Sequence, residues 1–353
     1  MSARYTILIV NPGSTSTKLA ICAETHLGCV KTIHHPPPRL AEFSRVWSQF
    51  SYRLELCREW ATDHLKICDA VVSVGGLLRP LQSGTYLVNE KMIHDAESNV
   101  QGEHASNLGC ALAYRLASEF RALPIVVDPV SVDEFEPLAY YSGHPLIKRR
   151  SLSHAISIHA VAHRAVNELR LPLRNSSFVV CHLGGGISVA AVRNGRIIDV
   201  NDAASDGPFS PERTGGIPLQ PLINLCFSGK CTQGQVKSMI MGRGGLVAYL
   251  GTNSTEEVEH RVGCGDVHAK EVYEAMAYQI AKEIGAMATV LNGFVDAIVL
   301  TGGAAHSCMF IGWIEERVKF IAPVIVYQGE DEMQSLANGA LRVLRGEESA
   351  KEY

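Results

Sequence analysis

The sequence lacks several features that would place it quickly in a functional class. No apolar run approaches the roughly 20 residues of a membrane span. Acidic residues outnumber basic ones by 36 to 32, which gives a formal net charge of −4 and a pI near 6.4. Such a chain has no excess of positive charge for nucleic acid or an anionic membrane surface. We therefore expect neither of these as a partner.

Cysteine is present, but the patterns that give it a special role are missing. The ten cysteines are dispersed, most lie in apolar stretches, and no CxxC pair occurs. The apolar segment at the N-terminus is too short for a secretory signal and suits a strand better. We therefore expect reduced thiols in a cytoplasmic protein. His159 and His163 have the i, i+4 spacing of some zinc sites but lack the HExxH glutamate, so we interpret them as helix-surface histidines.

Two kinds of segment occur twice, in the same order. "ILIVNPGSTSTKLAI" (7–21) and "VVCHLGGGISVAAVRNGRIID" (179–199) each read as an apolar run, a glycine turn and a second apolar run. "CDAVVSVGGLL" (68–78) and "VDAIVLTGGAA" (295–305) each end an apolar run with Gly-Gly. A chain of 353 residues is also longer than one core usually serves. The repetition predicts two duplicated α/β domains that face one another across a cleft.

The spacing of apolar residues predicts the helices around these strands. Apolar residues recur with a helical period over residues 103–120, 153–169, 272–291 and 332–344. Asn194-Gly195 between two apolar runs predicts a hairpin turn. We place the first domain at residues 1–150 plus 331–353, so that the last helix returns to it, and the second domain at residues 151–330.

Both glycine turns carry groups that suit phosphate. In the first, four consecutive hydroxyl residues (14–17) are followed by Lys18, and in the second, Gly184–Gly186 follow His182. Glycine lets consecutive N–H groups point into one concavity, where they can hold an anion. A Walker A loop, GxxxxGK[ST], is absent. The turns therefore predict a different polyphosphate-binding architecture, with phosphoryl transfer and Mg²⁺ as its usual companion.

Several of these motifs resemble a known family. NPGSTSTK, HLGGG, "DGPFSPERTGGIP" (206–218) and "LTGGAAH" (300–306) are similar to the acetate and propionate kinase family. "GHPLIKRRSLSHA", "GGLVAYLGT" and "YQIAKEIGAMA" resemble its butyrate and branched-chain fatty acid kinase branch. The resemblance covers nearly the whole chain. It implies the actin-like ATPase (ribonuclease H-like) fold of sugar kinases, actin and Hsp70, and the reaction ATP + butanoate → ADP + butanoyl phosphate by direct in-line transfer.

The resemblance also implies a role for particular residues. The implied catalytic residues are Asn11, Lys18, His154, Arg213 and Asp128. The implied ATP-binding residues are Ser14, Ser16, His182, Gly184, Gly185, Gly186, Gly302, Gly303 and Ala304. The implied Mg²⁺ ligands are Ser16 and Glu332, although only one glutamate of the family's Asn-Glu-Glu run can be matched in Glu330-Asp331-Glu332-Met333.

Structural roles remain open for several of these residues. Short hydroxyl and carboxyl side chains also cap turns, as Ser14, Ser16 and Asp128 could do. His154 could cap a helix or pack in a core, and Arg213 could form a surface ion pair with its neighbour Glu212.

One position departs from the family pattern. The family has an arginine directly before the first Gly-Gly, and this chain has Val74. Loss of such a cation predicts weakened transition-state stabilisation. Three explanations remain open: Arg79 could reach the site, the protein could be a slow kinase, or it could bind ATP with poor turnover.

The alternatives to a fatty acid kinase are an ATP-binding regulatory module and a sugar kinase on the same fold. The expected partners are ATP, a short-chain fatty acid and further copies of this chain, joined through the second domain.

Overall fold

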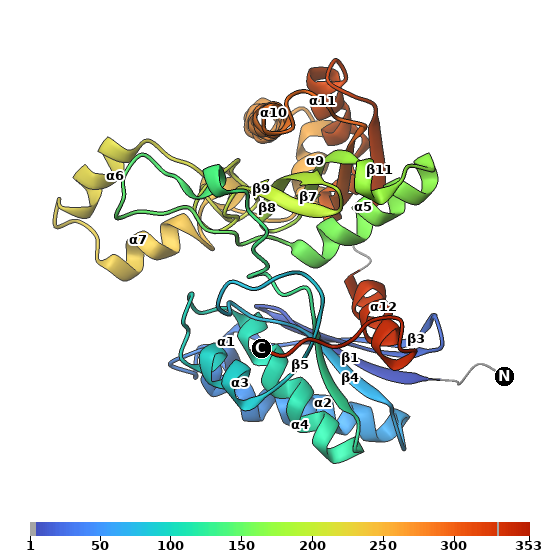
Figure 1. Ribbon diagram of the computed structural model, residues 1–353. Helices are drawn as coiled ribbons and strands as arrows, with labels where there is room; N and C mark the ends of the chain where they lie inside the picture. The colour runs from blue at the N-terminus through green and yellow to red at the C-terminus, as the bar shows by residue number, and fades with distance from the viewer. Residues whose placement is uncertain (1–4, 330–331) are drawn as a thin grey trace. The chain divides into compact units, whose positions relative to one another are not determined.

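The structure of the protein is a computed structural model that describes residues 5–329 and 332–353. The chain divides into two compact units, Met1–Asp133 with Asp331–Tyr353, and Glu134–Glu330. Each unit is built around its own sheet (Figure 1). In the described part of the chain, none of the helices combines the length and apolar character needed to span a membrane.

The first unit has a six-stranded sheet in the order β3-β2-β1-β4-β6-β5. Its strands are β1 (Thr6–Pro12), β2 (Ser16–Ala23), β3 (His26–His34), β4 (Ala70–Val74), β5 (Thr85–Leu87) and β6 (Leu123–Val127). The first three form an antiparallel meander, while β1, β4 and β6 run parallel. Because parallel strands end at the same edge of a sheet, the residues after β1, β4 and β6 come together there.

Helices cover both faces of this sheet. They are α1 (Pro37–Leu40), α2 (Phe50–His64), α3 (Glu90–Glu97), α4 (Leu108–Phe120) and α12 (Glu332–Leu344). Leu8, Val10 and Val71 pack with α2 and α4 on one face. Gly339 of α12 approaches Val127 on the other face so closely that an added Cβ would lie 2.6 Å from it. Figure 1 shows α12 opposite α2 and α4. Since side chains alternate along a strand, Asn11 and Val74 belong to the α12 face.

The second unit repeats this arrangement. Its sheet has the order β11-β10-β7-β8-β9, with strands β7 (Ser177–Leu183), β8 (Ile187–Arg193), β9 (Arg196–Val200), β10 (Ala297–Gly302) and β11 (Val324–Gln328). Again a three-stranded meander is extended by two parallel strands. The order matches β6-β4-β1-β2-β3 of the first sheet strand for strand, and β5 is the addition. The duplication read from the sequence is therefore confirmed in the topology.

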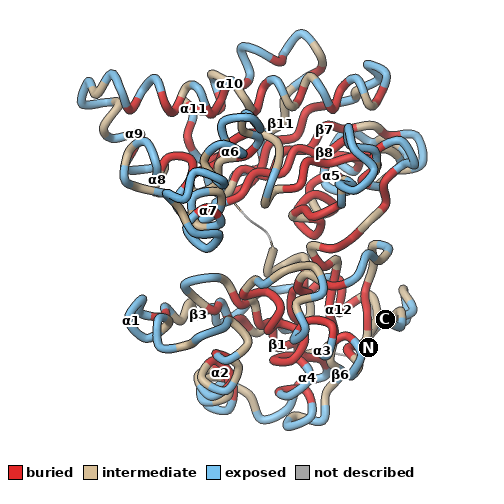
Figure 2. Tube along the Cα trace, turned by 90° about the vertical axis from the view of Figure 1, so that its left-hand side faces the viewer, coloured by how far each residue is buried: buried red, intermediate tan, exposed pale blue. Residues whose placement is uncertain are grey.

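The helices of the second unit enclose its sheet. They are α5 (Ala155–Leu169), α6 (Leu219–Cys226), α7 (Gln233–Ile240), α8 (Gly245–Leu250), α9 (Thr255–Gly263), α10 (Val267–Val290) and α11 (Cys308–Val318). Val179, Cys181 and Val189 face the cluster built by α10 and α11. The alternate residues, His182 and Ser188 among them, therefore face α5. Figure 2 shows β1, β7 and β8 as mostly buried segments, whereas β3 at the edge of the first sheet is largely exposed.

Several expected elements are found close to their predicted positions. The last helix covers Glu332–Leu344, as predicted. The Asn194-Gly195 hairpin turn joins β8 to β9, with both residues at positive φ (55° and 78°). The long helix α10 starts earlier than expected, at Val267, because the Asp266 side chain accepts a hydrogen bond from the Ala269 N–H at 2.9 Å and caps it.

Two features differ from the sequence-based expectation. His159 is buried rather than on the surface, and its Nε2 lies 3.2 Å from Glu134 Oε2. The structure also groups residues 134–150 with the second unit, since the Glu136 N–H donates to the Ile198 carbonyl at 3.0 Å and Arg149 pairs with Asp199 at 2.8 Å. Long-range contacts of this kind leave no local pattern in the sequence. His163 is exposed, as expected, and all ten cysteines are free.

Candidate active site

In the first unit, the predicted residues gather at the carboxyl edge of the sheet. Asn11 near the end of β1 is paired in register with Lys18 on β2. The Asn11 side-chain N–H donates to Glu332 Oε2 at 2.6 Å, although 321 residues separate them. Glu332 is the first residue of α12, where the helix dipole favours an acid. Asn11, Lys18 and Glu332 therefore belong to one small region, which Ser14 and Ser16 border on the connecting turn.

The turn between β1 and β2 is tight. The Gly13 N–H donates to the Ser16 carbonyl at 2.8 Å. Ser14 and Thr15 are exposed at its tip, whereas Thr17 is buried. Two hydroxyl residues are therefore exposed at the tip of the turn.

Arg53, which no sequence motif marked, holds this turn through hydrogen bonds to its carbonyls. Arg53 lies on α2, is fully enclosed, and donates to the carbonyls of Gly13 and Ser14 at 2.8 and 3.3 Å. A signal existed: Arg53 shares the buried stripe of its helix with Leu54, Cys57 and Ala61. A charged residue in a core stripe points to a partner inside the fold.

Asp128 follows β6 and closes a turn with Gly84. Its Oδ1 accepts the Gly84 N–H at 2.6 Å, and its own N–H donates to the Gly84 carbonyl at 3.1 Å. Asp128 also has a positive φ of 37°, an uncommon value for a residue with a side chain. The turn-forming role left open by the sequence is present in the structure, and any catalytic role would be additional to it.

Arg79 does not take the place of the missing family arginine. Its Nε lies 2.7 Å from Asp95 Oδ2 and its Nη2 lies 3.1 Å from Oδ1, a bidentate pair. The hydrogen bond from Arg79 lowers the pKa of Asp95 below its ordinary value. Val74 itself is buried at the end of β4, beside Val127. The position at which the family resemblance implies an arginine is therefore apolar here.

In the second unit, the two predicted histidines are in direct contact. The His154 ring stacks on the His182 ring with centroids 4.0 Å apart and planes 13° apart. His154 Nδ1 lies 2.9 Å from Ser188 Oγ, and Ser188 is the register partner of His182 across β7 and β8. His154 makes no side-chain cap for α5. Ser188, which the sequence analysis missed, stands out only as a polar residue in a buried apolar strand.

Two further hydroxyls lie beside His154. Ser153 Oγ and Ser157 Oγ are buried and have no hydrogen-bond partner among the described residues. They flank the start of α5, where backbone N–H groups already favour an anion. Buried donors without a partner are costly unless a ligand or water satisfies them. The start of α5 therefore adds donors to the region around His154.

Arg213 lies directly over the second glycine turn. An added Cβ at Gly186 would sit 2.3 Å from Arg213 Nη1 and 2.6 Å from Cζ, so only glycine fits beneath the guanidinium. Arg213 Nη1 donates to the Ala203 carbonyl at 2.8 Å. Ser210 Oγ joins the two segments, since it donates to the Gly185 carbonyl at 2.6 Å and accepts the Arg213 N–H at 3.2 Å.

The Arg213 guanidinium has hydrogen-bonding capacity left. Its Nε is buried without a hydrogen-bond partner, and no described carboxylate lies within 4 Å of it in an ion pair. The surface ion pair with Glu212 is therefore not formed. Burial lowers the pKa of Arg213, but a guanidinium remains charged at neutral pH. A partly buried cation whose buried Nε is unused suits an anionic ligand.

The third predicted turn adjoins the second. β10 runs parallel to β7 with Thr301 opposite His182, so Gly302–Ala304 follow at the same edge as Gly184–Gly186. Gly302 has a φ of 97°, and an added Cβ would lie 2.6 Å from the Leu183 carbonyl oxygen. A side chain at Gly302 would therefore disturb both turns.

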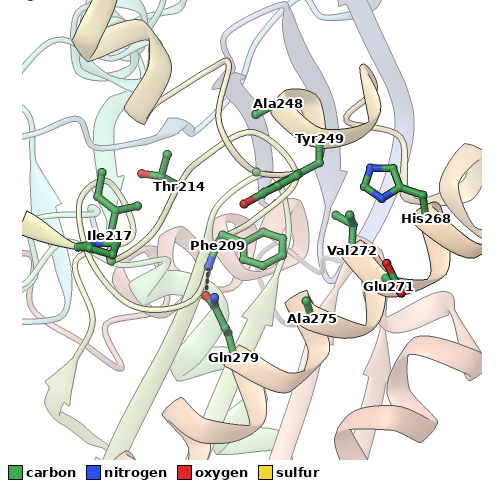
Figure 3. Close-up of a pocket in the computed structure, with 13 residues that line it drawn as sticks. Phe209, Thr214, Ile217, Ala248, Tyr249, His268, Glu271, Val272, Ala275 and Gln279 are labelled. Carbon is green, nitrogen blue, oxygen red and sulfur yellow. Dashed lines mark hydrogen bonds between the residues drawn. The ribbon is translucent and has the colours of Figure 1, made fainter. Parts of the chain in front are cut away.

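A surface cavity of about 500 Å³ lies next to the loop that carries Arg213 (Figure 3). One wall is the outer side of α10, with His268, Glu271 and Gln279, and Tyr249 of α8 lies opposite. The Gln279 side-chain oxygen accepts the Phe209 N–H at 3.1 Å, which ties this loop to α10. None of the predicted site residues lines the cavity.

The described residues contain no cluster of three or more histidine, cysteine, aspartate or glutamate side chains suited to a metal ion. Mg²⁺ does not require one, because it commonly uses one or two protein oxygens and takes the rest from phosphates and water. The Glu332 carboxylate beside Asn11, with the Ser16 hydroxyl on the adjoining turn, fits that pattern. Glu330 and Asp331, which precede Glu332, lie outside the described residues.

Comparison with known proteins identifies the family to which the chain belongs. A family model described as the Acetokinase family matches residues 136–319. A "Probable butyrate kinase" from Listeria monocytogenes serotype 4a is 48% identical over 353 residues, covering 99% of each chain. The chain belongs to the acetokinase family. "Butyrate kinase 2" from Clostridium acetobutylicum is 46% identical over 354 residues, again covering 99% of each chain.

Solved structures of the acetokinase family support the fold. The crystal structure of Porphyromonas gingivalis acetate kinase matches with a TM-score of 0.77 and covers 96% of this chain and 100% of that one, at 18% identity. At this identity the likeness establishes the fold alone. The predicted actin-like ATPase fold of this acetokinase-family chain is therefore confirmed.

Proposed function

We propose that this acetokinase-family protein is a phosphotransferase that uses ATP to phosphorylate the carboxylate of a short-chain fatty acid, with butanoyl phosphate and ADP as products from butanoate. The geometric observation that carries the proposal is the partly buried Arg213 guanidinium, fitted over Gly186 with its buried Nε unused. The choice of acid follows from relatives named butyrate kinase that match along the full chain.

In the proposed reaction, a carboxylate oxygen attacks the γ-phosphorus of ATP in line with the bond to the leaving ADP. A new P–O bond forms to the acid as the bond to ADP breaks, so the negative charge passes to ADP and no proton is removed. The carboxylate is already a nucleophile, and a catalytic base is not needed. Mg²⁺, when bound, would neutralise phosphate charge, and Glu332 and Ser16 are the residues that would hold it.

The remaining site residues are proposed to bind ATP and to stabilise the charge that develops on the phosphoryl group in transfer. The glycine turns at Gly184–Gly186 and Gly302–Ala304 are proposed to bind the phosphates and adenosine of ATP. Arg213 and His154 are proposed to donate to the equatorial oxygens as charge develops there. Asn11 and Lys18 are proposed to contact the group in transfer. The contacts described above, His154 on His182 and Arg213 on Gly186, support this assignment.

The alternatives are less well supported. A sugar kinase needs a carboxylate base to activate its hydroxyl nucleophile, and the arginine and histidine chemistry of Arg213 and His154 does not supply one. A regulatory module would bind ATP without turnover. Trapping with hydroxylamine separates the three: ATP with butyrate, isobutyrate, valerate or isovalerate should give a hydroxamate, and ATP with glucose should give none. ATP binding without any phosphorylated product would refute the proposed enzyme.

We also propose that the protein self-associates through its second unit. Helix α6 is apolar and contains no buried residue, with Leu219 and Ile223 exposed and Phe227 87% exposed just after it. An apolar surface of this kind commonly marks an interface. Phe227→Asp with Ile223→Asp should lower the mass measured by light scattering. The control Phe320→Asp, at an equally exposed phenylalanine (84%), should not. A native protein that is monomeric at micromolar concentration would contradict self-association.

We propose a cytoplasmic location, which ten free cysteines support because free thiols persist in reducing compartments. Fractionation of cells with antibody detection tests it, and recovery outside the cytoplasm would refute it.

A further inference from the structure

Arg53 is the most enclosed charged side chain among the described residues, at 1% exposure. It makes six hydrogen bonds. Nη1 donates to the Gly13 carbonyl at 2.8 Å, the Ser16 carbonyl at 3.3 Å and Thr17 Oγ1 at 3.2 Å. Nη2 donates to the Ser14 carbonyl at 3.3 Å. Nη2 and Nε both donate to Gln49 Oε1, at 2.8 and 3.0 Å. One guanidinium thus engages the whole turn between β1 and β2.

These hydrogen bonds fix the direction of the turn's amides. In a trans peptide the N–H points away from the C=O of the same peptide plane. The carbonyls of Gly13 and Ser14 are held on the Arg53 side, so the N–H groups of Ser14 and Thr15 point to the opposite, exposed side. Two adjacent amides that point the same way form an anion-binding concavity.

The charge of Arg53 is not compensated by an acid. All six hydrogen bonds end on neutral oxygens, five atoms in all, and no described carboxylate forms an ion pair with the guanidinium. Burial lowers the pKa of Arg53, and no carboxylate is among the groups that oppose this effect. Buried charges in proteins are usually paired. The missing negative charge would be supplied by a ligand on the other side of the turn.

A second layer holds Arg53 and the turn in place. Thr17 Oγ1, which accepts from Arg53, lies 2.8 Å from His35 Nε2, and His35 Nδ1 lies 3.2 Å from Tyr52 OH. The chain of contacts runs from α2 through the end of β3 to the turn. Such a network limits the movement of the guanidinium.

We propose that Arg53 is a positioning residue for the terminal phosphates of a nucleoside triphosphate. It aims the Ser14 and Thr15 amides at the phosphate oxygens and places behind them a buried positive charge that the polyphosphate completes. This inference rests on the proposed function, because it assigns ATP to the turn between β1 and β2.

The test compares Arg53→Gln and Arg53→Lys with Arg58→Gln. Arg58 lies on the same helix and also uses two nitrogens, which bond Glu119 at 2.9 and 2.8 Å on the surface. Arg53→Gln should lower kcat/KM for ATP by about 10²-fold, the scale for misplaced catalytic geometry. The KM for butyrate should change much less. Arg53→Lys keeps the charge but not the planar fork, so its kcat/KM for ATP should lie between those of Arg53→Gln and the native protein. Arg58→Gln should have the kcat/KM of the native protein.

Binding gives a readout that does not depend on turnover. ATP should raise the melting temperature of the native protein and of Arg58→Gln, and raise that of Arg53→Gln much less. If the native protein forms no acyl phosphate, the proposed reaction fails, and this shift still tests Arg53. A folded Arg53→Gln protein with native kcat/KM for ATP and a native ATP-induced shift would overturn the inference.

A second variant covers the case in which Arg53→Gln does not fold. Gln49→Met removes the acceptor of two Arg53 hydrogen bonds and leaves every hydrogen bond between Arg53 and the turn available. It should lower kcat/KM for ATP by a smaller factor and again spare the KM for butyrate. If Gln49→Met lowered kcat/KM equally for ATP and for butyrate, or lowered neither, the result would count against Arg53 as a positioning residue.

Discussion

At the scale of single residues, the contact between Arg213 and Gly186 leads to the most specific prediction. Arg213→Gln should lower kcat by about 10²–10³-fold, the loss seen when one preorganised donor to a developing charge is removed. The KM for ATP should change less, because the interaction strengthens in the transition state. Steady-state kinetics by hydroxamate formation measures both. A kcat close to that of the native protein would show that Arg213 is only structural.

The glycines beneath Arg213 provide a paired comparison. A Cβ at Gly186 would lie 2.3 Å from Arg213 Nη1, whereas one at Gly185 would lie 3.5 Å from Glu212 Oε1, an ordinary contact. Gly186→Ala should therefore lower kcat more than Gly185→Ala, by displacing the guanidinium. Equal effects of the two substitutions would contradict the steric argument.

Val74 is the residue at which a gain of activity is expected. Its side chain lies on the same face of the sheet as Asn11 and Glu332, and Arg79 is held by Asp95. Val74→Arg should therefore place a guanidinium near the proposed site and increase acyl phosphate formation. Val74→Lys is the control, since it supplies charge without a bidentate fork. No gain in rate with Val74→Arg in a folded protein would remove the idea that Val74 weakens the enzyme.

Some residue contacts could be predicted from the sequence and others could not. Resemblance to the family marked both Asn11 and Glu332, but no spacing rule joins residues 321 positions apart. Arg53 was missed because an arginine between apolar residues is normally taken to be exposed. Ser188 was missed because a serine in a strand carries no signal until its partner across the ladder is known.

At the scale of elements, the segment after β3 predicts a pH effect. Burial first, then the charges of Arg53 and His34, lowers the pKa of His35 to about 4. An unfolded histidine titrates near pH 6.5, so the unfolded chain binds the extra proton between about pH 6.5 and 4. The His35 contribution to stability is complete above this window and is lost as the pH falls through it. His35→Gln should therefore reduce the loss of unfolding free energy that occurs as the pH falls.

Urea unfolding at pH 7 and pH 5 measures this effect. The native protein should lose more stability between the two pH values than His35→Gln, and the difference isolates His35 from the carboxylates, which titrate in both proteins. Identical losses would show that His35 is not buried in its neutral form.

Local patterns predicted the regular elements better than their surroundings. The period of apolar residues located α12, and Asn194-Gly195 located the turn between β8 and β9. The three-residue strand β5 was not predicted, because it depends on pairing with β6 and on contact between Tyr86 and Lys351 near the other end of the chain. The burial of His159 likewise depends on a distant partner, Glu134.

At the scale of the whole molecule, the internal duplication explains why two glycine turns occur. The first hairpin of each sheet contains such a turn, and an arginine from outside the sheet lies against each turn. Arg53 holds the first turn by its carbonyls, and Arg213 lies over the second. The duplication was predictable from repeated motifs. Of the two arginines, only Arg213 could be predicted, because only Arg213 lies in a recognisable motif.

The central claim is that a carboxylate oxygen attacks the γ-phosphorus of ATP. Butyrate labelled with oxygen-18 in its carboxylate tests it most directly, in the presence of ATP, Mg²⁺ and hydroxylamine. Hydroxylamine attacks the acyl carbon of the product and releases phosphate together with the bridging oxygen. The account predicts inorganic phosphate that carries one oxygen-18 atom. Phosphate without the label, formed at the rate of ADP release, would mean that water is the nucleophile and would contradict the account.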